Sequence, residues 1–111
     1  MNQRLIQDLF LWVLRRRRRF VVCGGSMLPT IRPGDSLLID KKYYAHQSPA
    51  INDIVLFRDP REFDRIMVKR IVRLDKDTVF LQGDNPTEST DSRHFGAVHS
   101  SELIARVTSW F

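Results

Sequence analysis

Hydrophobic positions near the start of the chain recur at the spacing of a helix. The apolar stripe consists of Leu5, Ile6, Leu9, Phe10, Trp12 and Val13. This spacing predicts a short amphipathic helix. The apolar run is too short for a membrane span, which needs about 20 residues. A secretory signal would carry its positive charge before the apolar run, whereas here the arginines follow it.

After residue 20 the pattern changes to short apolar and β-branched runs separated by turn residues. The predicted strands cover residues 20–23, 36–40, 54–57, 66–74, 78–81 and 103–107. This pattern predicts a mainly β fold, a compact antiparallel barrel or sandwich preceded by the short N-terminal helix. We expect two parts, with residues 1–19 as helix and arginine run and residues 20–111 as a single domain.

Residues 83–102 form a segment of twenty residues with little strand pattern. Unstructured loops of this length are uncommon in a compact domain and are usually functional. The segment is rich in Asp, Asn, Ser and Thr, whose side chains can order a loop through local hydrogen bonds. The segment is therefore either functional or held in place by its own contacts.

The net charge of +5 comes from one run, Arg15–Arg19, because the other 106 residues carry 13 bases and 13 acids. This balance argues against a specific nucleic-acid partner. The simpler interpretation is a helix docked on its own domain or a partner, with solvated arginines. The alternative is peripheral contact of Arg15–Arg19 with an anionic membrane surface.

Cys23 is the single cysteine, so no intrachain disulfide or cysteine-rich zinc site can form. The three histidines, His46, His94 and His99, fit none of the usual metal-ligand spacings. We predict no metal and no cofactor. The expected location is the cytoplasm, with peripheral membrane contact as the alternative.

Lys69 is a candidate general base. Strand alternation places it on one face with Met67 and Ile71, where it would lose water. Desolvation would lower its pKa from the ordinary value of about 10.4 toward neutrality. The alternative is a lysine whose stem packs while its ammonium reaches solvent.

Ser26 is the matching candidate nucleophile. Gly24 and Gly25 precede it and allow close approach of a substrate, and Pro29 restricts the chain after it. Taken alone, the segment is equally well a glycine-rich turn with a capping serine.

Five short motifs, taken together and in order, favour the catalytic interpretation of Ser26 and Lys69 over the structural one. They are SMLPT at 26–30, PGD at 33–35, DIV at 53–55, VKRI at 68–71 and GDN at 83–85, followed by Ser89, Asp91, Ser92 and Arg93. In this order they resemble the signal peptidase I-like serine proteases over roughly residues 20–108. The resemblance implies the compact antiparallel β fold of the signal peptidase and LexA-like type.

The resemblance also implies residue roles. Ser26 would be the nucleophile and Lys69 the general base of a Ser/Lys dyad, and the backbone N–H of Ser26 would stabilise the oxyanion. Ser89 would orient the lysine amine through its hydroxyl. Asp91 and Arg93 would form a structural pair that braces the long loop.

The sequence departs from this family's pattern at three places. Gly24 stands where many bacterial members carry a serine whose hydroxyl completes the oxyanion hole. Asn52 replaces the usual glycine before Asp53. Residues 1–19 are not expected to span a bilayer, and residues 61–65 leave no room for the large β insertion of classical members. Gly24 and Met27 are candidates for substrate contact.

The segment at 85–96 is most similar to the soluble nickel-type superoxide dismutase maturation proteases. This similarity implies a precursor partner whose N-terminal extension is removed. A nickel-delivery site at His94 and His99 is disfavoured because two histidines lack further ligands. The alternatives are a signal peptidase that lies on the membrane and cleaves secretory signal peptides, and a non-catalytic or LexA-like regulatory module.

Overall fold

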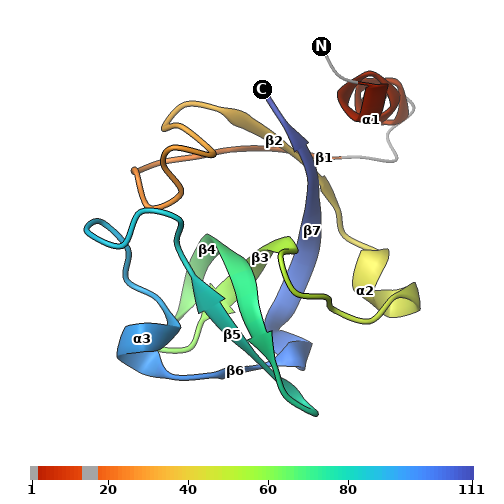
Figure 1. Cartoon of the computed structure of the whole chain (residues 1–111). Coiled ribbons are helices and arrows are strands. Elements are labelled where there is room, and N and C mark those ends of the chain that lie inside the picture. Colours follow the sequence, from red (N-terminus) through yellow and green to blue (C-terminus); the bar gives the residue numbers. More distant parts are fainter. Residues whose placement is uncertain (1–2, 14–17) are drawn as a thin grey trace.

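One antiparallel sheet of seven strands dominates the computed structural model of the chain, which describes residues 3–13 and 18–111 (Figure 1). The strands run in the order β1-β2-β7-β3-β4-β5-β6. They are β1 (Arg18–Val21), β2 (Ser36–Asp40), β3 (Ile54–Asp59), β4 (Glu62–Leu74), β5 (Thr78–Gln82), β6 (Val98–His99) and β7 (Leu103–Trp110). The helices are α1 (Gln3–Val13), α2 (Tyr43–His46), α3 (Ser92–Phe95) and a 3-10 turn (Ser100–Glu102).

The predicted mainly β fold with a short N-terminal helix is confirmed, but several boundaries differ. β1 begins inside the arginine run, because Arg18 pairs with Ile39 of β2. β4 begins four residues before the predicted strand, at Glu62, which pairs with Asp59. The predicted loop at 83–102 contains α3, β6 and the 3-10 turn. These elements are too short to produce a recognisable hydrophobic period.

β3 lies at the centre of two hydrophobic clusters. Ile54 and Leu56 pack toward one side, with Leu37, Ile39, Ala105 and Val107 of β2 and β7. Val55 and Phe57 pack toward the other side, with Met67, Ile71, Val79 and Leu81 of β4 and β5. Because both faces of β3 are covered, its apolar residues are continuous rather than alternating.

Helix α1 lies against β7 and β2. Asp8 of this helix is only 1% exposed, and it accepts a hydrogen bond of 2.5 Å from the hydroxyl of Ser109 in β7. The helix is therefore docked on its own domain, as the simpler interpretation of the sequence expected. None of the helices in the described part of the chain is long and apolar enough to cross a membrane.

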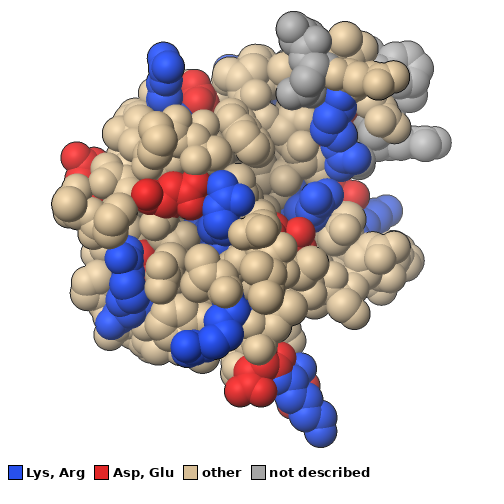
Figure 2. Space-filling model, viewed as in Figure 1, with Lys and Arg blue, Asp and Glu red and all other residues tan. Residues whose placement is uncertain are grey.

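The predicted arginine patch is only partly described. Arg15–Arg17 lie outside the described residues, whereas Arg18 and Arg19 belong to β1. The Nε of Arg19 donates to the hydroxyl of Ser36 at 2.8 Å. On the face shown in Figure 2, basic and acidic side chains are interspersed, in line with the charge balance of the body. The division of the chain at residue 19 stays a prediction.

Candidate active site

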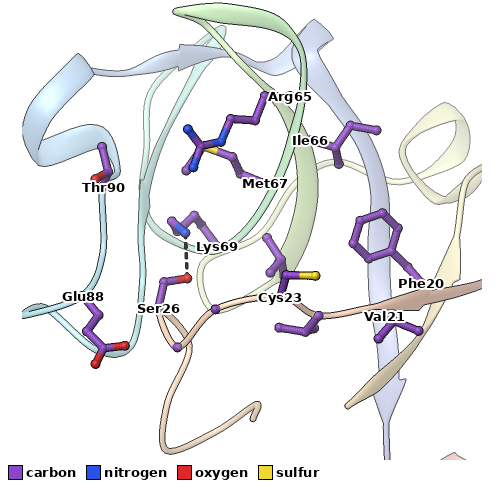
Figure 3. A pocket seen from close by; sticks show the side chains of 14 residues that line it. Phe20, Val21, Cys23, Ser26, Arg65, Ile66, Met67, Lys69, Glu88 and Thr90 are labelled. Carbon is purple, nitrogen blue, oxygen red and sulfur yellow. Dashed lines mark hydrogen bonds between the residues drawn. The ribbon is translucent and has the colours of Figure 1, made fainter. Parts of the chain in front are cut away.

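Ser26 and Lys69 meet in the folded chain although 43 residues separate them. The Nζ of Lys69 lies 2.8 Å from the Oγ of Ser26 (Figure 3). Ser26 lies in the turn after β1, and Lys69 lies within β4. This distance allows a proton to pass directly between the two groups.

The position of Lys69 in the sheet explains its environment. It pairs with Val55 across β3 and β4, and it shares its face with Met67 and Ile71, as strand alternation predicts. The residue is 3% exposed, so its ammonium does not reach solvent. Burial lowers the pKa of Lys69 to about 8, against an opposing effect from the carboxylate of Asp91. A buried amine of this kind can act as a base near neutral pH.

A cleft of about 380 Å³ opens over this pair (Figure 3). Its walls come from the segment of β1 that leads to Ser26, from β4, and from the loop after β5. The lining residues are Phe20, Val21, Val22, Cys23, Gly24, Gly25, Ser26, Arg65, Ile66, Met67, Val68, Lys69, Glu88 and Thr90. A peptide in this cleft would contact both members of the pair.

The two residues predicted to contact substrate differ in placement. Gly24 lines the cleft. Met27 is 1% exposed and packs in the core with Ile31 and Leu37, so its predicted substrate contact requires correction. After Ser26 the chain turns inward, which directs the Met27 side chain away from the cleft and into the first cluster.

Hydrogen bonds from Asn85 hold the turn that carries Ser26. The Asn85 N–H donates to the carbonyl of Ser26 at 2.8 Å, and its side-chain amide donates to the carbonyl of Gly25 at 3.1 Å. The carbonyl of Gly25 and the N–H of Ser26 belong to the same peptide, and in a trans peptide these two groups point in opposite directions. Since the Gly25 carbonyl points to the side chain of Asn85, the N–H of Ser26 is directed away from it. A fixed donor of this kind is what an oxyanion site requires.

Gly24 adopts a φ of +84°, in the left-handed region that favours glycine. A Cβ at this position would meet no described atom within 4 Å. The lack of a side chain here is thus set by backbone conformation rather than by space.

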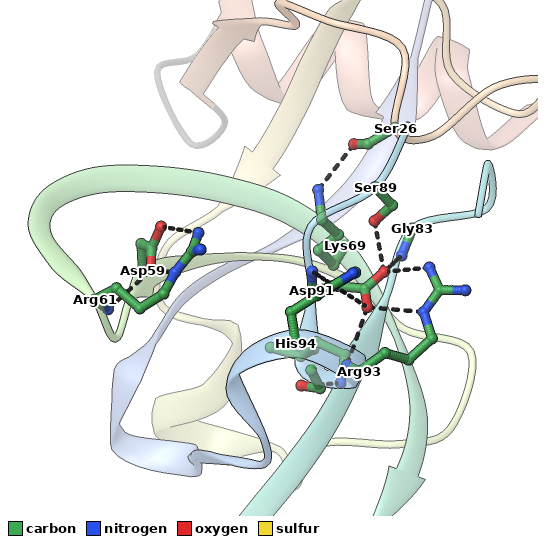
Figure 4. Close-up of polar contacts among 11 residues, drawn as sticks. Ser26, Asp59, Arg61, Lys69, Gly83, Ser89, Asp91, Arg93 and His94 are labelled. Carbon is green, nitrogen blue, oxygen red and sulfur yellow. Dashed lines mark hydrogen bonds and ion pairs between the residues drawn. The ribbon is translucent and has the colours of Figure 1, made fainter. Parts of the chain in front are cut away.

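Asp91 lies fully buried beneath the pair and collects several hydrogen bonds (Figure 4). Arg93 donates to it through Nε at 2.9 Å and Nη2 at 2.7 Å, and the backbone N–H of Gly83 donates at 2.9 Å. Burial would raise the pKa of Asp91, but these bonds outweigh it and hold the pKa well below its usual range. The predicted Asp91–Arg93 pair is present, and its carboxylate is not solvated.

Ser89 makes a different contact from the predicted one. Its hydroxyl donates to Oδ2 of Asp91 at 2.5 Å, whereas the prediction gave it a bond to the lysine amine. The carboxylate is the stronger acceptor, so it takes the hydroxyl proton. Figure 4 shows Ser89 between Lys69 and Asp91. Its role in orienting the amine stays a prediction.

Sequence reasoning did not find the contacts of Arg70, Asp84 and Thr30. The guanidinium of Arg70 forms two hydrogen bonds with Asp84, and the hydroxyl of Thr30 donates to the same carboxylate at 2.5 Å. These contacts join the lysine strand to the serine turn. The only available signal was the presence of all three residues in the quoted motifs.

The histidines near the loop have structural roles. His94 Nδ1 accepts the backbone N–H of Asp91 in the cap of α3, and His99 caps the following 3-10 turn. Within residues 3–13 and 18–111, no group of three or more histidine, cysteine or acidic residues could hold a metal ion.

Comparison with known proteins agrees with this geometry. The family model described as signal peptidase, peptidase S26, matches residues 9–79 and 72–111. The chain belongs to this family. Membership of the peptidase S26 family makes it a signal peptidase I-like serine endopeptidase.

Mitochondrial proteases are among its relatives in the family. The mitochondrial ATP-independent inner membrane protease subunit 1a of Arabidopsis thaliana is 33% identical, covering 80% of this chain and 70% of the relative. The mitochondrial inner membrane protease subunit 1 of Schizosaccharomyces pombe is 27% identical, covering 76% and 66%. Signal peptidase I of Aquifex aeolicus is 33% identical over 54% of this chain and 23% of the relative. The chain thus spans about two thirds of the length of the mitochondrial relatives.

Proposed function

We propose that Ser26 and Lys69 form the catalytic dyad of a protease that removes an N-terminal segment from a precursor protein. One observation carries the proposal. A lysine amine with 3% exposure lies 2.8 Å from a serine hydroxyl at the wall of an open cleft. Burial favours the neutral amine, and only the neutral amine can accept the serine proton.

The first half of the reaction forms an acyl-enzyme. Nζ of Lys69 takes the proton of Ser26 while Oγ bonds to the carbonyl carbon of the scissile peptide. The backbone N–H of Ser26 donates to the resulting oxyanion. Lys69 then gives its proton to the leaving nitrogen, the C–N bond breaks, and the new N-terminal amine leaves.

The second half of the reaction releases the acyl group. Lys69, neutral again, accepts a proton from water as the water oxygen attacks the ester carbon. Collapse of the second tetrahedral intermediate returns the proton to Oγ of Ser26. Asp91 has a supporting role, because its negative charge favours the ammonium that forms at Lys69 in both transition states.

The substrate that we propose first is a nickel superoxide dismutase precursor with an N-terminal extension. Support comes from the resemblance of the segment at 85–96 to that branch of proteases. The extension would lie extended in the cleft between β1 and β4. The enzyme itself would need no cofactor and would act in the cytoplasm.

A second candidate is removal of signal peptides by an enzyme held at a membrane surface. The relatives named as inner membrane proteases and as signal peptidase I favour it. Sedimentation with anionic vesicles separates the two candidates. Salt-sensitive binding that requires Arg15–Arg19 supports the second, and its absence supports the first.

To test the dyad, purified protein is mixed with candidate precursors, and the new N-termini are identified by mass spectrometry. We expect Ser26→Ala and Lys69→Ala to abolish cleavage without unfolding the protein. Lys69→Arg should also be inactive, because arginine stays protonated. Cleavage retained by any of these variants would remove the dyad from the mechanism.

A further inference from the structure

The cleft is apolar on one side of the Ser26–Lys69 pair and polar on the other (Figure 3). The apolar side is formed by Phe20, Val21 and Ile66. Val21 and Ile66 are 48% and 41% exposed, so their side chains are accessible to a peptide. The polar side is formed by Arg65, Glu88 and Thr90. A bound peptide would therefore meet apolar surface on one side of the pair and charge on the other.

Arg65 is the charged residue on the same wall as the base. It shares a face of β4 with Met67 and Lys69, since these positions alternate along the strand. Figure 3 shows its guanidinium directed into the cleft, on the same side as the amine of Lys69. Its positive charge acts on Lys69, whose pKa it helps to lower. Among the described residues, no carboxylate forms an ion pair with Arg65, so its donors are available to a ligand.

We propose that Arg65 selects peptide substrates that carry an acidic side chain close to the scissile bond. This inference rests on the proposed protease function and specifies its substrate class. A guanidinium binds a carboxylate through two parallel hydrogen bonds, which gives geometry as well as attraction. Glu88 also lines the cleft, and its negative charge repels a substrate carboxylate, so Arg65 rather than Glu88 would hold the acidic side chain.

The substrate carboxylate would also assist the chemistry. Lys69 becomes an ammonium when it takes the proton of Ser26, and the cation of Arg65 opposes this new charge. A carboxylate bound at Arg65 neutralises that opposition in the transition state. The preference for acidic peptides should therefore appear in kcat as well as in KM.

The experiment compares peptides that share a cleavable sequence and differ only by Glu or Gln at one position on either side of the cut. With wild-type protein, we expect the best Glu peptide to exceed its Gln partner about five-fold in kcat/KM, as for an exposed ion pair. The ratio should fall to about one in Arg65→Gln. In Arg65→Glu a Lys peptide should exceed its Gln partner instead. Measurement well above the pKa of Lys69 keeps the base neutral in every variant.

Glu88→Gln is the matched control, because it removes one charge from the same cleft. It should preserve or raise the preference for Glu peptides, because Arg65 is unchanged and the repulsion from Glu88 is removed. High salt should weaken the preference in the wild-type protein, since ions screen an exposed pair. The proposal is wrong if Arg65→Gln keeps the wild-type ratio of kcat/KM for Glu and Gln peptides. It is also wrong if the wild-type protein shows no preference for Glu peptides.

Binding separates this inference from the proposed function. Fluorescence anisotropy of labelled peptides with Ser26→Ala measures the preference without cleavage. In one outcome, Glu peptides bind preferentially, Arg65→Gln removes this preference, and the wild-type protein cuts no peptide. This outcome would support the role of Arg65 and refute the dyad. Cleavage with no charge preference in either assay would refute Arg65 and leave the dyad standing. If the protein shows neither a binding preference nor cleavage, both the role of Arg65 and the proposed protease function are wrong.

Discussion

Arg70 and Asp84 form a bidentate ion pair that joins strand β4 to the loop after β5. Nε of Arg70 lies 2.9 Å from Oδ1 and Nη2 lies 2.8 Å from Oδ2. Arg70 follows Lys69 directly in β4, and Asp84 also accepts the hydroxyl of Thr30. Three segments that bring Ser26 and Lys69 together therefore converge on one carboxylate.

Loss of this carboxylate should loosen the site. We expect Asp84→Asn to lower the free energy of unfolding by about 1–2 kcal/mol, because two charge-assisted hydrogen bonds lose their ionic partner. The rate of cleavage should fall by about ten-fold, since a small displacement of Ser26 from Lys69 impairs proton transfer. Urea unfolding and initial rates give the two values. In a double-mutant cycle with Arg70→Gln the effects should be less than additive, and full additivity would show that the pair does not act as one unit.

The pH dependence of cleavage should follow the protonation of Lys69. Burial lowers its pKa to about 8. The base is charged and inactive below this pH and neutral above it, so kcat/KM should rise through about pH 8 and then level off. Measured rates between about pH 6 and pH 10 test this. A profile that is flat over this range would exclude Lys69 as the base.

The same burial should cost stability. The pKa of Lys69 is lower in the folded chain than its ordinary value of 10.5. Between about pH 8 and pH 10.5 the unfolded chain therefore binds more protons, and stability rises with pH across that window. Below about pH 8, Lys69 is charged in both the folded and the unfolded chain, and the full destabilisation from its burial is present.

Lys69→Met should thus be inactive but more stable than the wild-type protein. The expected gain at pH 7 is up to about 3 kcal/mol, and it should vanish as the pH rises above the ordinary lysine pKa. Chemical unfolding at several pH values measures it. Equal stability of the two proteins at pH 7 would contradict the desolvation that the proposed mechanism requires.

The sequence predicted features that depend on neighbours along the chain. Alternation in β4 placed Lys69 beside Met67 and Ile71, and the structure confirms that shared face. The same reasoning could not place the side chain of Met27. This residue lies in a turn, where no regular alternation indicates which way a side chain points. It is a core residue, contrary to the prediction of substrate contact.

Contacts between distant segments were beyond the reach of the sequence pattern. Thr30 and Asp84 are 54 residues apart, and their contact depends on how the turn after β1 packs against the loop after β5. Ser89 could bond to either Lys69 or Asp91, and the competition is decided by a carboxylate whose burial the local sequence does not reveal. Motif order suggested that these residues belong to one site, but their partners required the fold.

Gly83 offers a test of how tightly the two serines are packed. A Cβ at this position would lie 2.5 Å from the carbonyl oxygen of Ser26 and 2.7 Å from the Cβ of Ser89. Gly83→Ala must therefore displace one of them. We expect a loss of about 1–3 kcal/mol in stability from overpacking, and a fall in kcat of at least ten-fold from misplacement of Ser26.

Gly34→Ala is the control for this substitution. Gly34 has a φ of +90°, and a Cβ there would meet no described atom within 4 Å. Gly34→Ala should lower the free energy of unfolding by about 1–2 kcal/mol through backbone strain. It should keep its kcat, because the added methyl group would meet neither Ser26 nor Lys69. Thermal unfolding and initial rates on one substrate compare the two variants. If both lose activity in proportion to stability, the activity loss in Gly83→Ala reflects general destabilisation, and the close packing around Ser26 has no separate effect on catalysis.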